Sequence, residues 1–135
     1  MLDIIEEISQ NAGKVWTILN VHGPLSPTIM VKTTSLDEKQ LYAAIGWLAR
    51  ENKICKNGNI YELRETNLTG KIGSDAGKLW RIFETWGDVD VGSMTRLAQI
   101  DEQDVYFALG WLARENKIET DMSISKGNLM RFRLK

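Results

Sequence analysis

The chain has 135 residues, of which 43% are apolar and 26% charged, and its formal net charge is −1. This composition is that of a soluble globular protein and excludes a disordered or fibrous one. A single cysteine, Cys55, excludes an intramolecular disulfide and a zinc site built on several thiolates.

The N-terminal segment and the lengths of the apolar runs indicate where in the cell the protein is found. No apolar run reaches the roughly 18 to 20 residues that a membrane span needs. Asp3, Glu6 and Glu7 stand where a signal peptide would carry cations. We therefore expect a cytoplasmic protein with no membrane contact.

Two strings of the sequence recur at one common offset. Residues 12–16, AGKVW, return as AGKLW at residues 76–80, and GWLARENKI at residues 46–54 returns unchanged at residues 110–118. The copies therefore align without a gap, and the chain is predicted to hold two domains, residues 1–66 and 67–135. The segment that joins them is too short for a free-swinging linker, so the domains should touch.

The first copy begins with two predicted helices. Apolar residues at helical spacing indicate a helix from Asp3 to about Val21, which Gly23 terminates. A short extended piece near Leu25 follows. Proline at the first helical turn then predicts a second helix over residues 27–34.

A third helix and a hairpin complete the first copy. Ser35 followed by Glu38 predicts a capping box, and Leu48 belongs to an apolar stripe that runs along the helix to near Glu51. Asn52 is expected as a left-handed cap. The turn pair at residues 57–58, Asn-Gly, predicts a hairpin of strands over residues 54–56 and 59–63.

The second copy is expected to repeat this series. Its first helix carries a stripe made of Ile72, Ala76, Leu79 and Phe83 and stops at Gly87. An extended piece at residues 89–91, a second helix at 93–99, a third helix containing Leu112, and strands at 118–125 and 129–134 follow. Three helices closed by a hairpin define a winged helix-turn-helix domain. The predicted fold class is mainly α with small β-hairpins (α+β), as two tandem winged helix-turn-helix domains.

The strings AGKVW and AIGWLARENKI, with Gly-Pro-Leu-Ser at residues 23–26 between them, resemble a small prokaryotic winged helix-turn-helix family long catalogued as a domain of unknown function. The resemblance covers about residues 8–64 and 72–134. It implies this fold and a role in DNA binding or transcription, and it carries over no catalytic residue. The tandem arrangement departs from the single domains typical of the family.

Several features argue against an enzyme. His22 and Cys55 have no equivalent in the second copy, where Trp86 and Glu119 stand. The repeated Asp-Glu pairs at 37–38 and 101–102 suit the first turn of a helix, whose dipole they offset. Gly-Lys at 13–14 lacks the rest of a phosphate-binding loop. We expect no catalytic residue, metal site, cofactor or small-molecule ligand.

Binding is the remaining function, and two hypotheses stand. In the first, the protein is a DNA-binding transcriptional regulator whose third helix reads the major groove while the wing contacts the backbone of duplex DNA. In the second, it is a protein-protein interaction or assembly module that uses the aromatic third-helix faces for a partner or for self-association. The candidate contact residues on these faces and on the second wing are Lys39, Gln40, Ala43, Arg50, Phe107, Arg114, Lys126, Arg131 and Arg133.

The balance of basic and acidic residues bears on the choice between these two hypotheses. Residues 1–70 hold 7 Lys or Arg against 8 acids, and residues 71–135 hold 10 against 10, so neither half is basic as DNA-binding domains usually are. In the second copy Asp104 and an outward Phe107 would suit a protein interface better than a groove of DNA. Trp47 and Trp111 flank the third helices, and an alternative is that they complete each domain's own core.

Overall fold

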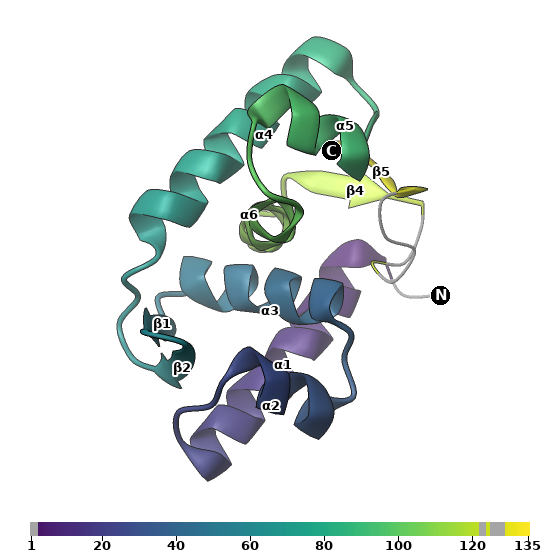
Figure 1. The fold of residues 1–135 in the computed structure, drawn as a ribbon. Helices are drawn as coiled ribbons and strands as arrows, with labels where there is room; N and C mark the ends of the chain where they lie inside the picture. Colours follow the sequence, from purple (N-terminus) through teal and green to yellow (C-terminus); the bar gives the residue numbers. More distant parts are fainter. Residues whose placement is uncertain (1–2, 122–123, 125–128) are drawn as a thin grey trace.

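The computed structural model describes residues 3–121, 124 and 129–135. The chain folds into two stacked halves with the third helices of the two copies in the middle (Figure 1). The expected fold class, mainly α with small hairpins, is confirmed.

The first copy contains three helices and one hairpin. Its elements are α1 (Ile4–His22), α2 (Pro27–Thr34), α3 (Glu38–Arg50), β1 (Ile54–Asn57) and β2 (Ile60–Leu63). The strands pair antiparallel, and Gly58 in the turn has a φ of 64°, as the Asn-Gly pair predicts. Leu25 forms an isolated bridge with Tyr61, which ties the extended piece to the hairpin.

The second copy repeats this order with additions at its start. A π-helix, η1 (Thr69–Gly73), precedes α4 (Ser74–Trp86), and the rest comprises β3 (Val89–Asp90), α5 (Val91–Ala98), α6 (Glu102–Arg114), β4 (Ile118–Thr120) and β5 (Arg131–Leu134). Strand β5 lies between β3 and β4. The described strands are shorter than predicted, and the turn expected at residues 126–128 lies outside the described residues.

Side chains and special backbone angles set the helix ends. The predicted left-handed cap at Asn52 is confirmed by its φ of 62°. The capping box predicted from Ser35 and Glu38 is wrong by two residues. The backbone N–H of Gln40 donates to the carboxylate of Asp37 at 2.8 Å, and the N–H of Asp37 donates to the Gln40 side chain at 3.0 Å. Ser35 has a φ of 63°, in the left-handed region, and ends α2 instead, whereas Asp37 has the extended backbone that is typical of an N-cap residue.

The buried side chains form two clusters, and each copy contributes to both. Ile72 and Phe107 of the second copy belong to the cluster of the first, while Ile4, Ile8 and Ala43 of the first belong to the cluster of the second. The expectation that the copies touch is therefore confirmed, and they share their cores.

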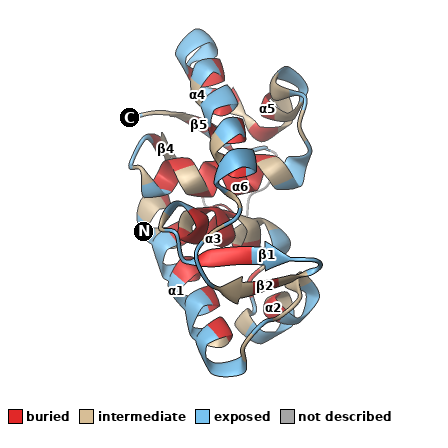
Figure 2. Ribbon diagram, turned by 90° about the vertical axis from the view of Figure 1, so that its left-hand side faces the viewer, coloured by how far each residue is buried: buried red, intermediate tan, exposed pale blue. Residues whose placement is uncertain are grey.

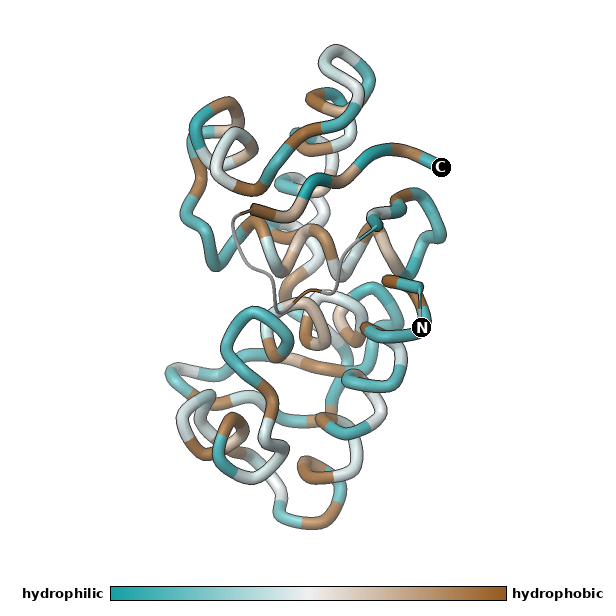
Figure 3. The backbone as a smooth tube through the Cα atoms, turned by 90° about the vertical axis from the view of Figure 1, so that its right-hand side faces the viewer, coloured by the Kyte–Doolittle hydropathy of each residue, from teal (hydrophilic) through white to brown (hydrophobic). Residues whose placement is uncertain are grey.

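Because the two copies share their buried clusters, the most buried residues lie where the copies meet. Figure 2 shows buried residues concentrated on α3 and α6, between the two halves. Figure 3 shows hydrophobic and hydrophilic positions alternating along the helices, as expected where each helix buries one face. Leu48 and Leu112 are each 2% exposed, so the buried stripe predicted for each third helix is confirmed.

Candidate functional site

The third helices of the two copies pack directly on each other at two glycines. A Cβ atom at Gly46 would overlap the backbone carbonyl of Phe107, and one at Gly110 would overlap the carbonyl of Ala43. The backbones of α3 and α6 are therefore in contact where they cross. Only glycine allows so close an approach.

The faces predicted to point outward are covered by each other. Ala43 is 0% and Phe107 is 7% exposed. The Phe107 ring packs on Tyr42 of the other copy, with centroids 5.1 Å apart and an interplanar angle of 54°. The expectation that Phe107 is exposed is wrong, because the second apolar face of one third helix buries the equivalent face of the other.

Two ion pairs join the copies across this interface, and they use the same repeat positions with the two copies exchanged. Arg50 lies 3.1 Å from Glu115, and Arg114 lies 3.0 Å from Glu51. Each guanidinium also lies over a tryptophan of the other copy, Arg50 over Trp111 at 5.6 Å and Arg114 over Trp47 at 5.7 Å from the ring centroid. The identical segments of the two copies, residues 46–54 and 110–118, thus contact each other across the interface.

These ion pairs should contribute little to stability, because both arginines are about half exposed and solvent screens such pairs. We expect a double-mutant cycle of Arg50→Ala and Glu115→Ala, measured by urea unfolding, to give a coupling energy of about 0.2 to 1 kcal/mol. The matched control is the pair Arg64 and Glu62, which lies within one copy at 3.2 Å. A coupling energy well above that of the control would show that the pairs hold the copies together.

The other predicted contact residues lie apart from one another. Lys39 and Gln40 are half-buried in the first turn of α3, where the Gln40 side chain is used by the capping box. Arg131 and Arg133 lie on β5 in the second copy, and Lys126 lies outside the described residues. Whether any of these residues contacts a partner stays a prediction.

The described cations of the second wing have acidic neighbours. Arg131 lies 3.4 Å from Asp88, and Arg133 contacts Glu119 and Asp121, each at 3.0 Å. The hydrogen bonds that Arg133 donates to these carboxylates raise the pKa of its guanidinium, which in turn holds the pKa of Asp121 below its usual value. A phosphate would have to compete with carboxylates already in place.

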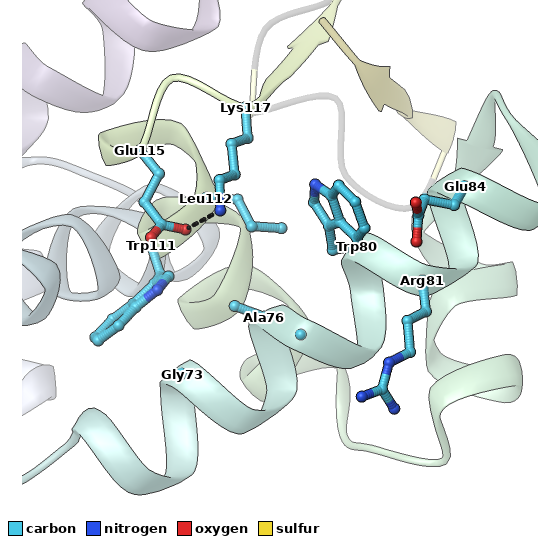
Figure 4. Close-up of a pocket in the computed structure, with 10 residues that line it drawn as sticks. Gly73, Ala76, Trp80, Arg81, Glu84, Trp111, Leu112, Glu115 and Lys117 are labelled. Atoms are coloured by element: carbon cyan, nitrogen blue, oxygen red, sulfur yellow. Dashed lines mark ion pairs between the residues drawn. The ribbon is translucent and has the colours of Figure 1, made fainter.

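Two grooves occupy equivalent places in the two copies. One, of about 530 Å³, lies between α4 and α6, and the other, of about 340 Å³, lies between α1 and α3. Tryptophans line both, namely Trp80 and Trp111 in the larger and Trp16 and Trp47 in the smaller (Figure 4 shows the larger). These grooves are not predicted from the sequence, although the repeated strings contain all four tryptophans.

Three helices with a hairpin, present twice, define a tandem winged-helix protein. A family model described as winged helix-turn-helix domain (DUF2582) matches residues 1–64 and again residues 65–131, so the chain belongs to this family. The predicted family resemblance is thereby confirmed, while the boundary between residues 66 and 67 stays a prediction. Searches of curated proteins and of solved structures give no match.

Two negative findings concern the described residues. Among them, no group of three or more His, Cys, Asp or Glu side chains is placed to hold a metal ion. The helices that the structure describes include none with the length and apolar character needed to cross a membrane.

Proposed function

We propose that this protein is a non-enzymatic protein-interaction module and does not read DNA with its third helices. The observation that carries the proposal is the contact of α3 and α6 at Gly46 and Gly110. A recognition helix must lie in the major groove, so α3 would first have to leave α6. That separation would expose Ala43, Phe107 and the shared clusters to water.

Electrostatics supports the same proposal. Protein affinity for duplex DNA comes largely from Lys and Arg side chains that neutralise phosphates. The chain has a net charge of −1, and Arg131 and Arg133 on β5 already pair with acids. Neither observation favours a polyanionic partner.

The test is a titration of the full chain with duplex DNA across salt concentrations. We expect no saturable binding even at about 50 mM salt, where phosphate contacts are strong. Fluorescence anisotropy of labelled duplexes of varied sequence measures this binding.

A DNA-binding regulator gives a different result. Binding would weaken steeply with salt, and Arg131→Ala with Arg133→Ala would flatten the log-log slope by up to about two phosphate equivalents. Gln40→Ala would then change the sequence preference, since an amide can read a base edge. Arg64→Ala on the first wing is the matched control. Salt-dependent binding that requires the second wing would overturn the interaction-module proposal.

A further inference from the structure

We propose that Phe107 selects the partner at the crossing of α3 and α6, so that a first copy pairs with a second copy and not with another first copy. The side of α3 or α6 that lies against the other copy is called the pairing face. Such selection goes beyond the proposed function, because it acts between copies of the chain whatever partner the module holds.

Most of the pairing face is the same in both copies. The crossing glycines, the arginines and glutamates of the ion pairs and the tryptophans under the guanidinium groups all lie in residues 46–54 and 110–118, which have one sequence. Two first copies from different chains would therefore find the same crossing, ion pairs and ring contacts. These contacts hold copies together without choosing between like and unlike partners.

The third helices differ mainly in their N-terminal halves. The differing positions carry Lys39, Gln40, Leu41, Ala43 and Ile45 in α3, and Gln103, Asp104, Val105, Phe107 and Leu109 in α6. The four polar residues belong to neither buried cluster, and the leucines, Val105 and Ile45 pack in the cluster of their own copy. Only Ala43 and Phe107 are buried in the cluster of the opposite copy. This position is therefore where the two pairing faces differ inside the core.

Phe107 fills a space that the first copy provides. The residue is 7% exposed, and its ring centroid lies 5.1 Å from that of Tyr42. If two first copies paired, each would present Ala43 to this space instead. A cavity would remain beside each tyrosine, and a cavity destabilises a core because its lining loses contacts.

Two second copies would meet the opposite problem. Ala43 is 0% exposed within the cluster of the second copy, and Phe107 of another second copy would have to take its place. The buried neighbours would then have to shift, and overpacking destabilises a core as well. The unlike pair, with one small and one large residue, avoids both the cavity and the overpacking.

The other side chains that cross between the copies discriminate little. Ile4 and Ile8 of α1 pack with the cluster of the second copy, and their equivalents Leu68 and Ile72 pack with the cluster of the first. The equivalent residues are similar or identical in volume, and volume-conserving exchanges are tolerated well. The choice of partner therefore depends chiefly on Phe107.

Selection at Phe107 keeps the pairing within one chain. The segment between the copies is fixed on the first wing, where the Asn67 side chain bonds both backbone groups of Lys56, at 2.9 and 2.7 Å. Each chain carries one pairing face of each kind, so like pairing would join one chain to the next. Phe107, a candidate for self-association on the sequence alone, would then act against it.

The experiment removes the tether and measures which copies pair. A protease recognition sequence is inserted between Glu65 and Thr66 of the full chain, and the folded protein is cut there. Mild urea lets the pairs dissociate, and they re-form when it is removed. Native mass spectrometry distinguishes like from unlike pairs, because the two halves differ in mass. We expect unlike pairs to exceed like pairs about tenfold or more, a preference of about 1.4 kcal/mol or more.

Two substitutions each make the second copy more like the first at one buried position. Phe107→Ala introduces the residue of α3 that faces the other copy, and like pairs should then become as frequent as unlike pairs. Leu109→Ile is the matched control, because it introduces the α3 residue at a position that packs within its own copy. It should leave the preference unchanged.

Each outcome supports or overturns the selection. Like pairs as frequent as unlike pairs in the unsubstituted cut chain overturn it, and so do halves that stay apart after cutting. An unchanged preference in Phe107→Ala overturns the role of Phe107. If circular dichroism shows that Phe107→Ala does not fold, Phe107→Leu takes its place, and it should still raise the share of like pairs because leucine fills less of the space beside Tyr42.

Discussion

Replacing Gly46 or Gly110 by alanine should destabilise the chain by about 3 kcal/mol, at the upper end of the cost of overpacking. The added Cβ atom would overlap a backbone carbonyl of the opposite helix, that of Phe107 or that of Ala43. A side chain can change rotamer to make room, but a helix backbone cannot. The two helices must therefore move apart, and the contacts on both sides of the crossing loosen together. Urea unfolding of each variant measures the loss.

The matched control is the same substitution at Gly13 and Gly77. These residues also lie inside helices, but a Cβ atom there has open space. Alanine should therefore be neutral or stabilise the chain by up to about 1 kcal/mol, through helix propensity alone. If Gly46→Ala behaved like Gly13→Ala, the third helices could not be packed as the structure shows. Their faces would then be available to DNA.

Much of each single copy could be predicted from the sequence, because local patterns encode it. The Asn-Gly pair at residues 57–58 defines the turn of the first hairpin, and the helical spacing that includes Leu48 identifies the buried face of α3. The gapless repeat carries the same elements to the second copy, including the left-handed cap at Asn116, whose φ is 60°. Such signals depend on neighbours within a few residues.

The arrangement between the copies could not be predicted in the same way. Gly46 and Phe107 stand on a face that periodicity places opposite the apolar stripe, and nothing in the spacing of residues says what covers that face. Ile8 fits the stripe of its own helix, yet it packs in the cluster of the other copy. The grooves escaped prediction for a related reason, since a tryptophan at helical spacing is typical of a core. Only the contacts show that Trp16 stands at the surface.

Leu112→Ala or Leu48→Ala should cost about 2 to 5 kcal/mol, because each removes a buried side chain and leaves a cavity. Each residue is 2% exposed on the core side of its third helix. The two clusters share members across the copies, so damage to one should destabilise the whole chain rather than one domain. We therefore expect one cooperative transition in urea, with tryptophan fluorescence and circular dichroism changing together.

Val21→Ala is the control for this prediction, because Val21 is 68% exposed on α1 and its truncation should change the stability by no more than about 0.5 kcal/mol. Two separate transitions in Leu112→Ala would show that the copies fold independently and that the contact at Gly46 and Gly110 adds little. A loss below about 1 kcal/mol would contradict the burial of that face. A single transition shifted as a whole would mean that α3 and α6 cannot separate without unfolding the protein, because Ile72 and Phe107 would leave one cluster as Ile4 and Ala43 leave the other.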